Sequence, residues 1–241
     1  MCWQIDSHSY IDKDGSARDA DGRGRMGSAS MMRVSGRCQT FHKGKLLYRQ
    51  DDAADGWLEI GRGTVRLCHY YGDGRRQVLT FAVEGDVIGV DGGFRLCSAE
   101  ALTDGEAIWR RCDEPLSDVC EPDVAFAYRS ALSRALRSAE ENLKFFSYPT
   151  AIERLSAFLL NFDRRRGSPG DLELPMSRLD IAEHLGLTMH TISRAFSQLA
   201  RNGLIESPSP HRIVLRDRMK LAQFVGIEDY ETAAGPLSMV A

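Results

Sequence analysis

The sequence predicts an α+β protein, in which a small antiparallel β domain is followed by one long helix and then by a helical domain. Turn residues recur about every ten positions from Phe41 to Pro115, with short apolar stretches between them, as in small antiparallel sandwiches and barrels. At Pro122 the apolar period changes from that of strands to that of a helix. Two short helical patterns then meet at Gly186, a residue suited to a tight turn between helices.

Composition places the chain among globular proteins without a membrane span. Hydrophobic residues make up 43% and charged residues 27% of the 241 positions, as in ordinary soluble domains. The sequence has no apolar run of about 18 residues, the length that crosses a bilayer. Its start lacks the charged-then-apolar order of a secretory signal, and its six cysteines are scattered as expected of reduced thiols. These features predict a cytoplasmic protein with no membrane partner.

Residues 1–37 are rich in Gly, Ser, Asp and Arg and poor in apolar side chains. Such a segment buries too little surface to offset the entropy of ordering it, so the sequence predicts a disordered leader. An over-long start is an alternative, because Met26, Met31 and Met32 are other possible beginnings.

Residues 38–121 are expected to form the β domain. The stretch Thr64–Tyr71 alternates as a strand does, with successive side chains on opposite faces. The glycines of the segment GDG at residues 72–74 supply a hairpin turn, and the returning strand begins at Arg75.

Residues 122–149 are expected to form the long helix. Apolar side chains recur there at spacings of four and three. They are Val124, Tyr128, Leu132, Ala135, Ala139, Leu143 and Phe146. A sustained stripe of this kind is typical of coiled-coil contacts, so we expect residues 123–148 to join two copies of the chain into a homodimer. The alternative is a helix that packs only on its own β domain.

Residues 150–226 are expected to form the C-terminal domain, followed by a tail at residues 227–241. Thr150 and Glu153 form the capping box that opens the first helix of this domain. Lys and Arg outnumber Asp and Glu between residues 144 and 220, although the net charge of the whole chain is −3. A basic segment in an acidic chain hints at a nucleic-acid partner.

A pair of short helices is predicted within residues 174–206. Ser177 caps the first helix, Gly186 forms the turn and Thr188 caps the second helix. The inward positions are apolar, namely Ile181, Ala182, Leu185, Leu187, Ile192, Ala195, Phe196 and Leu199. The outward face of the second helix is polar. Together these features form the helix-turn-helix pattern, whose second helix enters the major groove of DNA.

A hairpin wing is expected after the helix pair, because the segments LIE at residues 204–206 and RIVL at residues 212–215 flank the turn-forming sequence SPSPH. The combination predicts binding to double-stranded DNA, where Arg and Ser on the second helix reach base edges. The residues expected at the DNA are His190, Thr191, Ser193, Arg194, Gln198, Ser177, Arg178, Thr188 and Arg212. Of these, Arg178 and Arg212 are expected to contact phosphates.

Residues 38–226 together resemble the Crp–Fnr superfamily of transcription regulators, and its FixK-like branch in particular. The matching segments are GRGTVRL, DGRRQV, VEGDVIG and SAEA in the β domain, TAIERLSAFLL after the long helix, and GLT, TISRAFSQL and NGLI in the helix pair. The resemblance implies a cyclic-nucleotide-binding-like antiparallel β-roll, a dimerisation helix and a winged helix-turn-helix. It also implies an activator of oxygen-limitation or nitrogen-metabolism genes, which contacts RNA polymerase and binds an inverted repeat of TTGA-type half-sites.

The second helix of the pair departs from the family at one position. Family members commonly carry Glu-x-x-Ser-Arg, and here the last two residues match as Ser193 and Arg194. An arginine at this place can pair with the O6 and N7 atoms of guanine. His190 stands in place of the Glu, which leaves one base pair of each half-site open.

The β domain departs from the ligand-binding members of the family. Cys97 stands where nucleotide-binding members have the arginine that pairs with the cyclic phosphate, and Asp86 replaces a Glu. Arg95 lies two positions earlier and is expected on the same strand face as Cys97. Iron–sulfur members have closely spaced N-terminal cysteines, whereas Cys2 and Cys38 are far apart. We therefore expect no cofactor, as is typical of the FixK-like branch.

Alternatives to a cofactor-free regulator stay open. A haem that senses nitric oxide would need an iron ligand, and the adjacent Cys68 and His69 must point to opposite strand faces. A redox role for Cys97, Cys112 or Cys120 is a second alternative. A cupin-like metalloenzyme is a third, although the β region lacks the set of His and Glu ligands that such an enzyme uses. We expect no enzymatic activity.

Overall fold

The computed structural model describes residues 10–11, 17–18, 36–111, 122–167 and 170–226. The chain divides into two units, residues 1–33 and residues 34–241. In the first unit the structure describes an antiparallel pair of short strands, β1 (Tyr10–Ile11) and β2 (Ala17–Arg18). The remainder of the predicted leader up to residue 35, and the tail at residues 227–241, lie outside the described residues.

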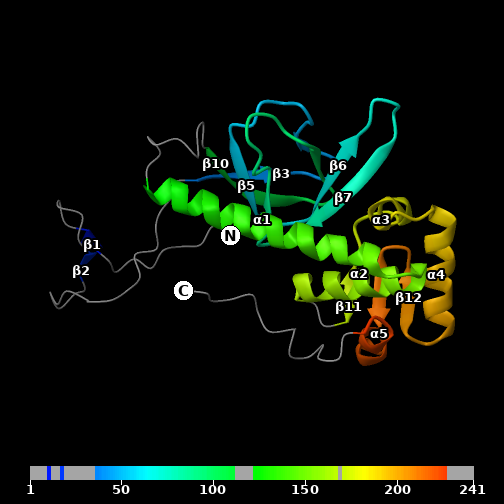
Figure 1. The fold of residues 1–241 in the computed structure, drawn as a ribbon. Coiled ribbons are helices and arrows are strands. Elements are labelled where there is room, and N and C mark those ends of the chain that lie inside the picture. The colour runs from blue at the N-terminus through cyan, green and yellow to red at the C-terminus, as the bar shows by residue number, and fades with distance from the viewer. Residues whose placement is uncertain (1–9, 12–16, 19–35, 112–121, 168–169, 227–241) are drawn as a thin grey trace. The chain divides into compact units, whose positions relative to one another are not determined.

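The β domain consists of two four-stranded sheets in which neighbouring strands run antiparallel (Figure 1). One sheet has the order β3-β10-β5-β8 and the other the order β4-β9-β6-β7. The strands are β3 (Arg37–Phe41), β4 (Leu46–Tyr48), β5 (Gly56–Arg62), β6 (Val65–Tyr70), β7 (Arg76–Ala82), β8 (Val87–Ile88), β9 (Ser98–Ala101) and β10 (Gly105–Arg111). Apolar side chains from both sheets, among them Phe41, Leu58, Val65 and Ala99, form its core. The antiparallel β-roll expected from the sequence is confirmed.

The predicted hairpin joins β6 to β7. Its turn contains Gly74 with φ of +84°, in the left-handed region that glycine adopts without a steric penalty. The register of the pair shifts between Leu67 and Cys68, and both side chains are buried. Cys68 belongs to a core cluster that also contains Phe158 of the second long helix, so β6 is covered on both faces at this point.

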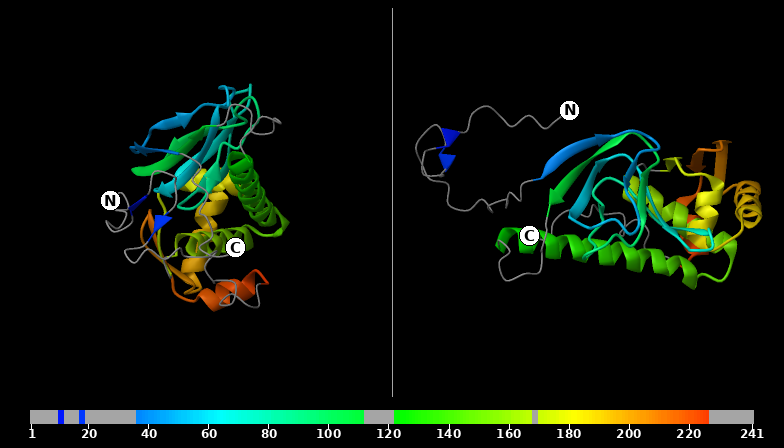
Figure 2. Two further views of the ribbon diagram at one scale, coloured as in Figure 1. Left: turned by 90° about the vertical axis from the view of Figure 1, so that its left-hand side faces the viewer. Right: turned by 90° about the horizontal axis from the view of Figure 1, so that it is seen from above.

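The long helix α1 (Pro122–Ser147) runs alongside the β domain (Figures 1 and 2). Tyr128 and Ala131 are buried against the β domain, where the Tyr128 ring meets the Trp57 ring edge to face at 5.4 Å between centroids. A second apolar stripe of α1 is exposed and consists of Leu132, Leu136, Ala139, Leu143 and Phe146. Tyr128 lies on the same side of α1 as Leu132, four residues later, but it is buried against the β domain, so its assignment to the dimer stripe is wrong.

The C-terminal domain begins with α2 (Ala151–Arg166), whose predicted capping box between Thr150 and Glu153 is confirmed. It continues with β11 (Asp171–Glu173), α3 (Arg178–Leu185), α4 (Met189–Arg201), β12 (Ile205–Ser209), β13 (Arg212–Leu215) and α5 (Arg218–Phe224). The strands form a three-stranded sheet of order β11-β13-β12, so the predicted hairpin wing is present with one additional strand. Among the described helices, none is long and apolar enough to cross a membrane.

Candidate nucleic-acid interface

The helix pair α3–α4 is held in register by its own caps. The Ser177 side chain accepts from the Asp180 backbone N–H while the Asp180 carboxylate accepts from Ser177, which completes a capping box at the start of α3. Gly186 ends α3 with φ of 66°, and the Leu187 N–H donates to the Ala182 carbonyl at 2.9 Å. These local bonds make α3, the turn and the start of α4 one compact unit, as the sequence predicts.

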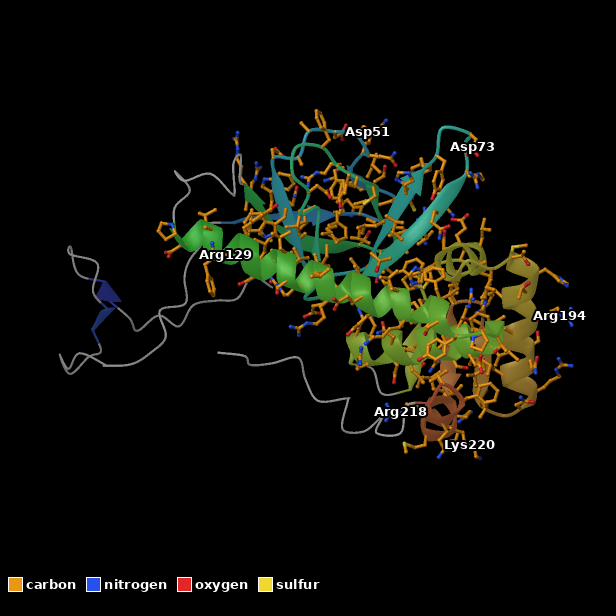
Figure 3. The ribbon with its side chains drawn as sticks, in the orientation of Figure 1. Asp51, Asp73, Arg129, Arg194, Arg218 and Lys220 are labelled. Carbon is orange, nitrogen blue, oxygen red and sulfur yellow. The ribbon has the colours of Figure 1, made fainter. Side chains whose placement is uncertain are left out.

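Helix α4 has one buried and one exposed face. The buried face, Ile192, Ala195, Phe196 and Leu199, packs into the core of the domain. The exposed polar face, which we call the reading face, consists of His190, Ser193, Arg194, Ser197, Gln198 and Arg201. Arg194 points away from the body of its domain, as Figure 3 shows. Because packing fixes the opposite side of the helix, these polar side chains are free to meet a groove.

Thr188 and Thr191, two of the residues predicted at the DNA, form hydrogen bonds with each other at the start of α4. The Thr188 hydroxyl accepts from the Thr191 backbone N–H at 3.1 Å, and the two hydroxyls lie 2.8 Å apart. Ser193 donates its hydroxyl hydrogen to the Met189 carbonyl at 2.9 Å, which leaves the oxygen available as an acceptor.

Sequence reasoning missed two members of the reading face, Ser197 and Arg201. Both are exposed and continue the outward stripe that begins at His190 and Arg194. The signal was present in the sequence, because these positions follow one another at spacings of three and four residues.

Arg178 lies at the first position of α3 and packs on α4. Its guanidinium carbon stands 3.2 Å from the centroid of the Phe196 ring. Desolvation by burial lowers the pKa of Arg178 to about 10, and its Nη1 atom has no hydrogen-bond partner within the described part of the chain. Because Nη1 is itself buried, a DNA phosphate would have to meet the other N–H groups of this partly desolvated guanidinium.

Arg212, the predicted phosphate contact in the wing, is paired with Asp171 of β11. Its Nε and Nη2 atoms donate to the two oxygens of that carboxylate at 2.9 and 2.7 Å. Both side chains are more than half exposed. The pairing orients the guanidinium, and the remaining N–H groups of its fork are not used in that bidentate contact.

The side chain of Arg95 is buried inside the β domain. Arg95 is 1% exposed, donates to the Gly89 carbonyl and lies over the Tyr48 ring at 4.6 Å from its centroid. The Asp91 carboxylate is 3.8 Å from Nη1 of Arg95. The expectation that Arg95 shares a strand face with Cys97 is wrong, because β9 begins only at Ser98 and both residues precede it. Ring stacking and the nearby carboxylate turn Arg95 into the domain interior instead.

The two buried cysteines, Cys68 and Cys97, are not activated as nucleophiles. Burial raises the pKa of both Cys68 and Cys97 to about 11, which keeps their thiols protonated at neutral pH. Cys112 and Cys120, the other candidates for redox chemistry, lie outside the described residues. Within the described ranges, no group of three or more His, Cys, Asp or Glu side chains could hold a metal ion.

Comparison with known proteins agrees with this arrangement. Family models match residues 38–109 as a cyclic nucleotide-binding domain and residues 153–224 as a Crp-like helix-turn-helix domain. The nitrogen fixation regulation protein FixK of Azorhizobium caulinodans is 34% identical over 200 residues, which cover 80% of this chain and 81% of that protein. The fumarate and nitrate reduction regulatory protein of Escherichia coli is 28% identical over 79% of each chain.

The solved structure of FixK2 from Bradyrhizobium japonicum is also similar, with 33% sequence identity and a TM-score of 0.71. The match covers 79% of this chain and 98% of that chain. These relatives are transcription regulators rather than enzymes, and their similarity extends over both the β domain and the helix-turn-helix. The chain therefore belongs to the Crp–Fnr family of DNA-binding transcription regulators, with FixK proteins among its relatives.

Proposed function

We propose that the protein binds an inverted repeat of TTGA-type half-sites as a homodimer and, through contact with RNA polymerase, activates genes of oxygen limitation or nitrogen metabolism. The observation that carries the proposal is the reading face of α4, whose polar side chains are exposed while the opposite side of the helix is fixed in the core. The roles named for the relatives, nitrogen fixation regulation and fumarate and nitrate reduction, support the choice of genes.

Different side chains of the reading face contact different bases in this proposal. Arg194 pairs with a guanine through O6 and N7, and Ser193 keeps an oxygen that accepts from an amino group of a base. His190 takes the base pair that a Glu contacts in other family members, where a neutral imidazole donates to guanine N7 or contacts a phosphate. Ser177, Arg178 and Arg212 flank the helix and address the phosphate backbone.

The exposed stripe of α1 supports a two-fold symmetric operator. Leu136 and Leu143 are 63% and 67% exposed, and residues 132, 136, 139, 143 and 146 repeat at the four–three spacing of a coiled coil. A second copy of the chain would cover this stripe. The two reading helices would then be related by a two-fold axis. A two-fold dimer reads an inverted repeat.

Arg194→Ala is expected to lower affinity for the operator about tenfold to a hundredfold, because a bidentate Arg–guanine pair contributes about 1–3 kcal/mol of discrimination. Affinity for random DNA should fall much less, since that binding depends on phosphates. Competition binding at fixed salt, with operator and scrambled duplexes, measures both. If the variant keeps its full ratio of specific to non-specific affinity, α4 does not read the bases.

Arg178→Gln is expected to weaken binding to all sequences alike and to flatten the dependence of log affinity on log salt by about one, the effect of losing one phosphate contact. Arg212→Gln should act in the same direction. Titrations over a range of salt concentrations, with operator and random duplexes, give the slopes. A loss of affinity restricted to the operator would instead make either residue a reader of bases.

No tight binding of cyclic AMP or cyclic GMP is expected, because Cys97 offers no charge to the phosphate and Arg95 is already held by Gly89, Asp91 and the Tyr48 ring. Isothermal titration calorimetry of each nucleotide into the protein is the measurement. Micromolar affinity would contradict the expectation, and loss of that affinity in Arg95→Gln would identify Arg95 as the phosphate ligand.

A further inference from the structure

The helix pair is tied to the β domain by a cluster of charged side chains on the side of α3 away from the reading face. Arg66 of β6 and Arg76 of β7 project toward α3, where both donate to Oδ1 of Asp180. Arg76 also donates from Nε to the Glu183 carboxylate at 2.8 Å. Arg66 has a further acceptor in Glu100 of β9 at 2.7 Å. We call these five side chains the clamp.

The clamp is poorly accessible to water, which makes its charges depend on one another. The side chain of Asp180 is 5% exposed and that of Arg66 is 11% exposed. Burial opposes ionisation of Asp180, but hydrogen bonds from Ser177 and the charges of Arg66 and Arg76 outweigh it and lower its pKa. Removing one member of such a cluster leaves another buried charge without compensation, which is far costlier than losing an exposed pair.

Asp180 connects the clamp directly to the fold of the helix pair. Its Oδ2 atom accepts from the backbone and hydroxyl of Ser177, while its Oδ1 atom accepts from the two arginines. One carboxylate therefore both caps α3 and joins it to the β domain. Because α3 continues through the Gly186 turn into α4 without a flexible linker, a restraint on α3 is also a restraint on α4.

The clamp leaves the DNA-binding surface open. The reading face of α4 and the wing residues 206–212 are exposed while the clamp is closed. Gln77 of β7 adds a further bond to the Glu183 carbonyl at the far end of α3, again on the side of the β domain. The contact thus restrains the orientation of the helix pair without covering its DNA-binding residues, as a preorganising contact does.

We propose that Arg76, with Arg66, Asp180 and Glu183, is a positioning residue for DNA recognition: the clamp sets the orientation of the reading helix from the β domain, and DNA affinity depends on it although Arg76 touches no DNA. Only one of the two readouts of this inference, operator affinity, rests on the proposed operator-binding function. Its other readout is the protection of the α3 amides in the free protein.

The test compares Arg76→Gln, Glu183→Gln and the double variant with Arg75→Gln as a matched control. Arg75 lies on the same hairpin, is largely exposed and pairs with Asp73, so its loss changes the net charge equally without touching the clamp. Arg76→Gln is expected to lower operator affinity about tenfold, within the usual range of coupling between sites, while Arg75→Gln leaves it near the wild-type value. Arg76→Lys, which keeps the charge, should recover part of the loss.

Glu183→Gln separates the clamp from general electrostatics. Removing a negative charge near DNA should tighten binding if only the net charge mattered, whereas loss of the clamp predicts weaker binding. The double variant should bind DNA better than the product of the two single effects predicts, because both partners of one pair are then absent. Hydrogen exchange should show faster α3 amides in each single variant, and circular dichroism verifies that the variants are folded.

Several outcomes would overturn the proposal. They are equal affinities of Arg76→Gln and Arg75→Gln, tighter binding by Glu183→Gln, strictly multiplicative effects in the double variant, or unchanged exchange of the α3 amides. If the wild-type protein does not bind the inverted repeat, the operator assignment fails, and the exchange measurement still decides whether the clamp restrains α3.

Discussion

Leu143→Glu is expected to make the protein a monomer and to remove tight operator binding. Leu143 lies in the exposed stripe of α1, where its two-fold copy would face it across the proposed dimer. The substitution places two carboxylates against each other in an interface that otherwise buries leucine, so association should lose several kcal/mol. The fold of one chain should be unaffected, because Leu143 is 67% exposed there and the α1 residues that pack on the β domain are on another face.

Sedimentation velocity and operator titration at matched protein concentrations measure the two consequences together. Arg137→Gln is the matched control, since Arg137 is an exposed residue of α1 outside the stripe and its substitution makes the same change in net charge. The monomer still has one reading helix, which can contact one half-site. It should therefore bind a single half-site weakly but measurably. A Leu143→Glu protein that sediments as a dimer and binds its operator normally would assign the dimer contact to another surface.

The helix pair could be predicted from sequence because its determinants are local. Ser177, Gly186 and Thr188 each satisfy backbone groups within a few residues of themselves, so the sequence contains the complete signal. The buried positions of α4 follow from one helical period, and all of them are buried in the structure. The same helical period also places Ser197 and Arg201 on the exposed stripe, so the prediction that ended the stripe at Gln198 was incomplete although the sequence contained the signal.

The errors arose where packing between distant segments decides. Tyr128 is buried against Trp57, and nothing near it in sequence distinguishes it from Leu132, which lies four residues later on the same side of α1 and is exposed. Strand alternation predicts that Arg95 shares a strand face with Cys97. In the structure Arg95 lies in a loop, where it contacts the Tyr48 ring and the Gly89 carbonyl. Such contacts join residues far apart in the chain, so a single sequence contains little trace of them.

Arg76 illustrates the same limit at the site itself. In sequence it belongs to a turn-flanking pair of arginines, and no feature separates it from its exposed neighbour Arg75. In the structure Arg76 pairs with two acids that lie more than a hundred positions later, whereas Arg75 pairs with the nearby Asp73. The clamp is therefore a property of the tertiary structure, and the sequence provides only its charges.

Acidification from pH 7 to about pH 4 is expected to destabilise the contact between α3 and the β domain through His184. The His184 ring is 3% exposed and lies among the rings of Phe81, Phe145 and Phe158, with centroids 5.2 to 5.7 Å away. Desolvation by burial lowers its pKa from 6.5 to about 4; the Val78 and Leu79 backbone opposes this shift, and the Arg165 charge adds to it. Its Nδ1 atom has no hydrogen-bond partner in the described part of the chain.

The direction of the effect follows from proton binding. Between pH 6.5 and about 4 the unfolded chain carries a proton on His184 and the folded chain does not, so stability falls as the pH falls through this window. At the lower end the loss approaches about 3 kcal/mol, because each unit of pKa difference corresponds to about 1.4 kcal/mol. Asp180 acts outside this window, since its lowered pKa keeps the carboxylate charged until the pH falls below its ordinary value of 3.8.

Urea unfolding of the wild type and of His184→Phe, at several pH values between 7.5 and 4.5, isolates the contribution of this one group. Phenylalanine keeps an aromatic ring in the cluster and cannot bind a proton, so the difference in unfolding free energy between the two proteins should shift in favour of the variant as the pH falls. His190→Gln is the control, because it removes one histidine from the exposed reading face and leaves the buried ring of His184 in place. Parallel curves for the wild type and His184→Phe would mean that the buried ring accepts its proton as easily in the folded chain as in water, and the aromatic contact between α3 and the β domain would then not be sensitive to acid.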